Sequence, residues 1–255
     1  MTQPNRDELL EALRALDDPE SGAPFGEAIR AVAVRDGKVA VEVELGYPAR
    51  GAADALVRRI ESLVRDFDGV DAVTVDLASR VRAHAVQGGL KPLDGVRNVI
   101  AVASGKGGVG KSTVAAYPAL ALAAEGARVG ILDADIYGPS QPRMLGLSGK
   151  PETTENRRIL PMLAHGIQAM SIGVLVSVDQ AMIWRGPMAT QALQQMLSET
   201  LWDDLDYLVI DLPPGTGDVQ LTLAQRIPVA GSLIVTTPQD VALDDVRRAV
   251  GMFRK

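Results

Sequence analysis

The chain is 255 residues long, carries a formal net charge of −6 at pH 7 and contains no cysteine. This length suits one large domain or two modest ones, and an apolar content of 47% is ample for a buried core. The acidic balance, without a long basic run, argues against a nucleic-acid partner. The lack of cysteine excludes disulfides and leaves no iron–sulfur ligands in this chain.

The apolar segments are short. None approaches the ~18 uninterrupted apolar residues of a membrane span. The polar N-terminus, Met1 to Asp7, lacks the apolar region of a signal peptide. We therefore expect a cytoplasmic protein with no membrane partner.

Residues 1–82 have the pattern of a small α+β domain. Leucines at helical spacing open it, and Asp36-Gly37 joins two alternating strands as a hairpin turn. Helix, hairpin, helix and strand are predicted at Asp7–Leu16, Ile29–Val34, Lys38–Leu45, Ala52–Phe67 and Val70–Leu77. Residues 83–96 lack periodicity and contain Gly88-Gly89, which predicts a linker.

Residues 97–255 alternate between strand and helix patterns, and their strands are almost entirely apolar, as a buried parallel sheet requires. Strands are predicted at Asn98–Ser104, Arg128–Asp133, Ile167–Ile172, Tyr207–Asp211 and Ser232–Thr236. Helices are predicted at Lys111–Glu125, Met188–Thr200, Asp218–Arg226 and Asp240–Phe253. The predicted fold class is α/β, a mostly parallel sheet flanked by helices and incomplete at the C-terminus, preceded by the small α+β domain.

The stretch from Ser104 to Thr113 reads SGKGGVGKST between a predicted strand and a predicted helix. Glycines let successive backbone N–H groups point inward, and the helix N-terminus adds unpaired donors and partial positive charge. Lys111 can reach the terminal phosphates of a nucleotide, and the Ser112 hydroxyl can bind Mg²⁺. The pattern predicts a phosphate-binding loop of a P-loop NTPase. Its cofactor-binding residues are Gly105, Lys106, Gly107, Gly108, Val109, Gly110, Lys111, Ser112 and Thr113.

A further lysine in this loop, Lys106, narrows the class of P-loop NTPase. Gly105 to Ser112 resembles the deviant Walker A pattern G-K-G-G-x-G-K-[ST] of the MinD, ParA and nitrogenase-iron-protein ATPases. The resemblance implies ATP sandwiched in a homodimer, with Lys106 reaching the nucleotide of the partner subunit. Lys106 and Lys111 are thus expected to be catalytic.

Carboxylates follow two further predicted strands. Apolar residues lead to Asp211 in a Walker B pattern, which predicts that it holds Mg²⁺. In the D-x-D of Asp133 and Asp135, the resemblance implies that Asp135 is catalytic and orients the attacking water, and that Asp133 lies near the metal shell. Ser112, Asp133 and Asp211 are the expected magnesium residues. Gly215, in a loop that resembles the second switch of that family, is expected to offer its N–H to the γ-phosphate.

Longer stretches resemble the Mrp/ApbC family of iron–sulfur cluster carrier ATPases. They are the DADIYGPS run from Asp133, residues 142–146 and 181–187, the run from Thr237 to Lys255, and the small domain in front. The resemblance implies ATP and Mg²⁺ as cofactors, a homodimer, and apo iron–sulfur proteins and cluster-assembly proteins as partners. In that family the cluster is held by a C-x-x-C pair, which lies in the sequence after the position that corresponds to Lys255. We expect a C-terminally truncated chain, with the cluster bound only by the full-length protein.

Two alternative functions remain open. A MinD- or ParA-type positioning ATPase would need an amphipathic membrane helix or a basic surface, and a P-loop kinase would need an acceptor pocket.

Three single residues carry further expectations. Arg185 is expected in an exposed turn or a dimer contact, and the linker residue His84 is expected to be solvated. Pro118, inside the first helix after the loop, is expected to cost ~3 kcal/mol.

Overall fold

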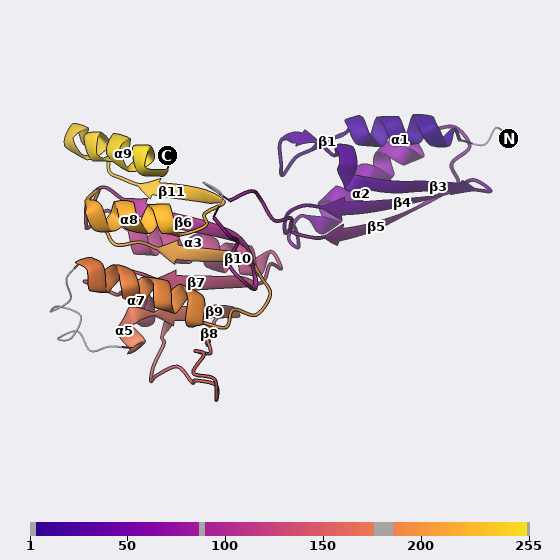
Figure 1. The fold of residues 1–255 in the computed structure, drawn as a ribbon. Helices are drawn as coiled ribbons and strands as arrows, with labels where there is room; N and C mark the ends of the chain where they lie inside the picture. Colours follow the sequence, from indigo (N-terminus) through magenta and orange to yellow (C-terminus); the bar gives the residue numbers. More distant parts are fainter. Residues whose placement is uncertain (1–3, 87–89, 176–185, 254–255) are drawn as a thin grey trace. The chain divides into compact units, whose positions relative to one another are not determined.

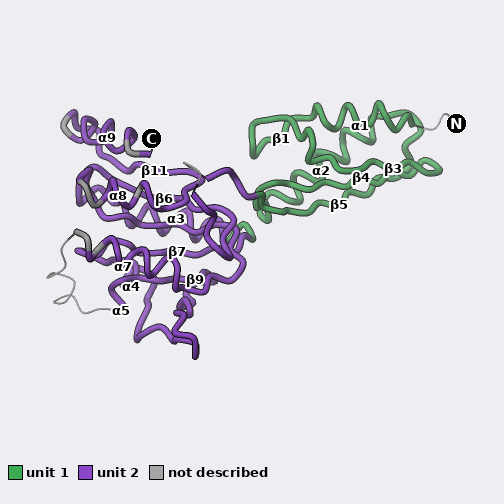
Figure 2. Tube along the Cα trace, viewed as in Figure 1, with its two compact units in different colours: residues 1–82, 124–126 green, residues 83–123, 127–255 purple. Residues whose placement is uncertain are grey.

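The computed structural model describes residues 4–86, 90–175 and 186–253. It divides into two compact units, residues 1–82 with 124–126, and residues 83–123 with 127–255 (Figure 2). The predicted motif at 181–187 lies largely outside the described residues, and Arg185 lies outside them altogether.

The first unit packs two helices on a three-stranded sheet of order β3-β4-β5 (Figure 1). Its elements are α1 (Arg6–Ala15), β1 (Asp17–Asp18), β2 (Ala23–Pro24), the short 3₁₀ helix Gly26–Ala28, β3 (Ile29–Arg35), β4 (Lys38–Leu45), α2 (Ala53–Arg65) and β5 (Ala72–Ser79). The hairpin turn has positive φ at Asp36, 48°, and Gly37, 72°, as a twisted two-residue turn requires. Strand alternation turns every second residue of β4 toward the helices, so that the core receives Val39, Val41, Val43 and Leu45.

The second unit is built on a six-stranded sheet of order β11-β6-β10-β7-β9-β8, in which only β8 is antiparallel to its neighbour. Its strands are β6 (Val96–Ser104), β7 (Val129–Asp133), β8 (Met162–Ala164), β9 (Ile167–Ser171), β10 (Leu205–Asp211) and β11 (Gly231–Val235). Its helices are α3 (Lys111–Ala124), α4 (Gln141–Leu145), α5 (Ile172–Leu175), α7 (Gly186–Glu199), α8 (Asp218–Arg226) and α9 (Asp240–Phe253). The predicted α/β class with a mostly parallel sheet is confirmed.

Helices cover both faces of this sheet (Figure 1). On one face, α7 and α8 place Leu193, Met196 and Leu223 against β6, β7 and β10. On the other face, α3 places Ala115 and Ala119 against β6 and β7. The strands are thus buried on both sides, which explains their continuous apolar sequence. None of the described helices is both long and apolar enough to cross a membrane.

Helix α3 runs without a break through Pro118, although proline removes one backbone donor from a helix interior. The preceding residue, Tyr117, is 70% exposed. Nothing in the structure explains why proline occupies this position.

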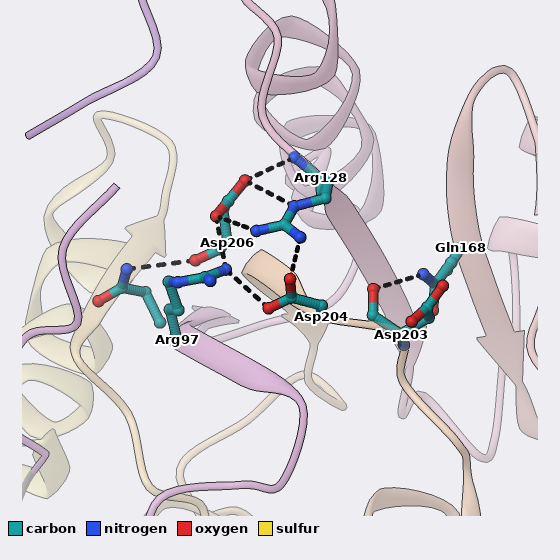
Figure 3. Close-up of polar contacts among 7 residues, drawn as sticks. Arg97, Arg128, Gln168, Asp203, Asp204 and Asp206 are labelled. Carbon is teal, nitrogen blue, oxygen red and sulfur yellow. Dashed lines mark hydrogen bonds and ion pairs between the residues drawn. The ribbon is translucent and has the colours of Figure 1, made fainter. Parts of the chain in front are cut away.

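An ion-pair network joins the amino-terminal ends of β6, β7 and β10 (Figure 3). Asp206 accepts hydrogen bonds from the backbone N–H of Arg128, at 2.9 Å, and from the guanidinium groups of Arg97 and Arg128. Asp204 pairs with the same two arginines, and the hydrogen bond from Arg128 lowers the pKa of Asp204. This network holds together the end of the sheet opposite the phosphate-binding loop.

Candidate nucleotide-binding site

The predicted phosphate-binding loop follows β6 directly and ends where α3 begins, at Lys111. It borders a cavity of about 280 Å³. Among the predicted site residues, the cavity brings together Lys106, Gly107, Gly108, Gly110, Lys111, Ser112, Thr113 and Asp135. Ser140, Met144 and Pro214 also line it. Gly105, Val109, Asp133, Asp211 and Gly215 are not among its lining residues.

The glycines of the loop keep this cavity open. Gly108 and Gly110 have φ of 78° and 87°, a conformation that other residues rarely adopt. A Cβ built at Gly107, Gly108 or Gly110 would meet no atom within 4 Å. The space that these missing side chains leave is a cradle at the N-terminus of a long helix, where an anionic phosphate fits.

Gly105 is required for a different reason. A Cβ at this position would lie 2.5 Å from the Cβ of Asp245 on α9. The first glycine of the loop therefore allows helix α9 to pack against the loop, and it does not line the cavity.

The buried ammonium group of Lys111 lies among carboxylates. Asp211 and Asp133 end neighbouring parallel strands and are paired in register. Lys111 Nζ donates a short hydrogen bond to Asp211 Oδ1 and lies 3.7 Å from Asp135 Oδ2. Lys111 is 5% exposed, and Asp211 is fully buried. The lysine that is expected to bind phosphate is thus held by the carboxylates around it.

Asp133 is buried and accepts hydrogen bonds on both oxygens. Its Oδ1 receives the N–H of Asp135, at 3.1 Å, and its Oδ2 receives the N–H of Gln141 and the hydroxyl of Ser171, at 3.0 and 3.1 Å. Burial, and then the negative charge of Asp211, raise the pKa of Asp133 to about 7. In this geometry Asp133 fixes the loop between β7 and α4.

Asp135 lies in the wall of the cavity, two residues beyond the end of β7. Burial raises its pKa, while the positive charge of Lys111 lowers it and the negative charge of Asp211 raises it further. Its Oδ1 accepts the N–H of Gly138, at 3.2 Å. Of the three aspartates at these strand ends, Asp135 is the one that lines the cavity.

Gln141, the first residue of α4, was not predicted as a site residue. Its Nε2 donates to the backbone carbonyl of Ser112 at 2.8 Å and to Asp211 Oδ2 at 3.0 Å, and its own N–H binds Asp133. A glutamine after Gly-Pro-Ser carries no recognisable signal in the sequence. Its position depends on the hydrogen bond by which the start of α4 binds Asp133, at the end of β7.

Among the described residues, Lys106, in the phosphate-binding loop, and Gly215, in the loop after β10, form no hydrogen bond or ion pair with the buried carboxylates. The side chain of Lys106 is exposed, and its carbonyl accepts the Ser104 hydroxyl at 2.9 Å. Within the described part of the chain, its ammonium group forms no ion pair. The N–H of Gly215 donates to the Ser104 carbonyl at 2.8 Å, and φ at Gly215 is 114°. Binding of a phosphate by this N–H would require that bond to break.

Among residues 4–86, 90–175 and 186–253, no group of three or more histidine, aspartate or glutamate side chains converges as a metal site would. His84, expected to be solvated, is exposed but places its backbone N–H and Nδ1 2.9 Å from Oδ1 of Asn98. The described residues thus do not form a site that would bind a metal through protein side chains alone. Magnesium in P-loop sites is usually held largely by water and nucleotide phosphates.

Comparison with known proteins places this geometry in a family. The profile of the NUBPL iron-transfer P-loop NTPases matches residues 95–255, which is more than half of the chain. The chain belongs to this family. A second profile, that of an iron–sulfur cluster assembly protein, matches residues 6–77.

Relatives of this P-loop NTPase include iron–sulfur cluster carrier proteins. That of Escherichia coli K12 is 50% identical over 230 residues, which cover 90% of this chain and 62% of the relative. That of Synechocystis is 45% identical over 255 residues, 98% of this chain and 72% of the relative. A nucleotide-binding protein of Archaeoglobus fulgidus, solved with ADP and cobalt, is 42% identical over 63% of each chain, with a TM-score of 0.55. This NTPase thus spans about two thirds of the length of the two carrier proteins.

Proposed function

We propose that this chain binds and hydrolyses Mg-ATP and serves as the nucleotide-driven part of an iron–sulfur cluster carrier that delivers clusters to apoproteins in the cytoplasm. The observation that carries the proposal is the glycine cradle beside Lys111, in a chain half identical to a cluster carrier protein. The 255 residues contain no cysteine, so they supply no thiolate to a cluster.

The two loop lysines have different surroundings, and these support different roles. Lys111 is buried and paired with Asp211, so ATP must draw its ammonium group away from the carboxylates and onto the β- and γ-phosphates. Lys106 is exposed beside the cavity and, in the described part of the chain, has no ion-pair partner. It is therefore available to reach the nucleotide of a second subunit, which supports an ATP-sandwiched homodimer.

The donor set suits magnesium. Ser112 would supply its hydroxyl and Asp211 its carboxylate, directly or through water, since oxygen ligands are what this cation takes. Bound there, magnesium would neutralise charge on the phosphates. Asp133 would keep the loop that carries Asp135 in place, because its oxygens already hold backbone amides and a hydroxyl. Asp135 would orient the attacking water.

The first unit supports the proposed role as a cluster carrier, but it contributes none of the described residues of the proposed nucleotide site. Residues 6–77 match an iron–sulfur cluster assembly protein. We assign to this unit the contact with apo iron–sulfur proteins or with cluster-assembly proteins.

The test measures phosphate release and sedimentation with and without Mg-ATP. Lys111→Ala should abolish ATP turnover, and Lys106→Ala should abolish ATP-dependent dimerisation. Lys150→Ala, at another exposed lysine of the same unit, is the matched control and should change neither. ATP-dependent dimers of Lys106→Ala would refute the sandwich, and turnover by Lys111→Ala would refute the ATPase site.

A further inference from the structure

Gln141 connects the three chain segments on which the proposed nucleotide site depends. Its side-chain amide group bridges the carbonyl of Ser112, at the start of α3, and the carboxylate of Asp211, at the end of β10. Its backbone N–H binds Asp133, at the end of β7. These bonds involve a residue that is 1% exposed. A buried glutamine thus ties the phosphate-binding loop to both strand-end aspartates.

The oxygen of the same amide group differs from its nitrogen. Within the part of the chain that the structure describes, Gln141 Oε1 and the neighbouring Ser140 Oγ are both buried without a hydrogen bond. A buried acceptor without a donor destabilises the fold, so the unpaired Oε1 offsets part of what the two hydrogen bonds of Nε2 contribute. Ser140, the residue before Gln141, lines the cavity. The unmatched acceptor on the lining residue, Ser140 Oγ, suits a ligand that brings donors, such as the water shell of a cation.

The bridge also decides which oxygen of Asp211 is available. Gln141 holds Oδ2, and Lys111 holds Oδ1. When a phosphate draws Lys111 away, Oδ1 alone becomes free, and it faces the space that Lys111 has left. The carboxylate cannot rotate without breaking the bond to Gln141. Its free oxygen is therefore presented in one orientation.

We propose that Gln141 is a positioning residue for the magnesium half of the nucleotide site. It fixes Asp211 and the start of α3 relative to each other, so that the cation and its water shell bind between them together with the nucleotide. This inference rests on the proposed function, because it assumes that the cavity binds a nucleotide with magnesium. It predicts that Gln141 contributes to the gain in nucleotide affinity that magnesium provides, and not to metal-free affinity.

The experiment titrates the chain with a fluorescent N-methylanthraniloyl derivative of ADP, once with magnesium and once with EDTA. Gln141→Met keeps the length of the side chain but removes its donors and its acceptor. The matched control is Gln168→Met, at a glutamine away from the cavity whose amide group also bonds to a distant segment. Its Nε2 donates to the carbonyl of Asp203 at 3.1 Å, and its Oε1 accepts the N–H of Asp203 at 3.0 Å (Figure 3). Losing a hydrogen bond to a charged group should reduce the magnesium-dependent gain about ten-fold in Gln141→Met. Gln168→Met should keep the full gain.

The possible results separate the two proposals. If Gln141→Met keeps the full magnesium gain, or loses metal-free affinity by the same factor, Gln141 is not a positioning residue for the cation. If the unchanged chain does not bind the ADP derivative at all, both proposals fail. Should Gln141→Met not fold by circular dichroism, Gln141→Asn carries the same amide group on a chain one methylene shorter, and the same criteria apply.

Discussion

Replacing Lys111 with methionine should destabilise the second unit even in the absence of nucleotide. The substitution leaves Asp211, which is fully buried, and Asp135, which is 7% exposed, without their cation. Removing one partner of a buried ion pair typically costs about 3–5 kcal/mol. The loss at pH 7 should lie at the lower end of that range, about 3 kcal/mol, because Gln141 still donates a hydrogen bond to Asp211 Oδ2. For a unit of this size the melting temperature should fall by about 6–12 °C.

The assay is urea unfolding at pH 7, followed by circular dichroism, for four chains. Lys111→Met should lose about 3 kcal/mol. The double variant Lys111→Met with Asp211→Asn should recover most of that loss, because the stranded charge is gone. Lys150→Met, at an exposed lysine, should stay within about 0.5 kcal/mol of the unchanged chain. The reasoning is refuted if Lys111→Met is as stable as the unchanged chain, or if the second substitution restores nothing.

Three further predictions concern the same unit. Pro118→Leu should raise the melting temperature in calorimetry, since an interior proline costs a helix ~3 kcal/mol; an unchanged or lower value would contradict this. Burial raises the pKa of Asp133 to about 7, above the unfolded value of about 3.9. Proton binding by Asp133 therefore stabilises the folded chain fully below about pH 4, and this contribution disappears as the pH rises through 7. The melting temperature should therefore decline less between pH ~5 and ~8 in Asp133→Asn, and equal slopes would count against it. Gly105→Ala should lose about 1–3 kcal/mol of unfolding free energy in urea, because its Cβ would lie 2.5 Å from that of Asp245. Gly107→Ala should keep its stability but bind nucleotide more weakly, because its Cβ would meet no atom within 4 Å and would enter the cavity. Equal stabilities of the two variants would contradict both assignments.

Much of this fold follows from patterns of apolar residues. The strand Lys38–Leu45 has the predicted bounds, because alternation and the Asp36-Gly37 turn fix its register. The helices Asp218–Arg226 and Asp240–Phe253 also agree with their predicted bounds. The three-residue strand Met162–Ala164 was missed, because so short a segment shows no periodicity.

The site was only partly predictable. Gly107, Gly108, Gly110 and Lys111 belong to a local pattern, so their presence at the cavity could be predicted from sequence. The contacts of Gln141 and the occupied oxygens of Asp133 depend on where β7, α4 and β10 meet in space, which spacing along the chain does not encode. The role of Gly105 against Asp245 is likewise a tertiary contact between distant segments.

The measurement that tests the central claim most directly is equilibrium binding of Mg-ATP, by isothermal titration, to the unchanged chain and to Lys111→Met. The account predicts saturable binding with one nucleotide per chain, and its loss in the variant. Absence of binding by the unchanged chain, or equal affinity in Lys111→Met, would contradict the assignment of the cavity beside Lys111 as the nucleotide site.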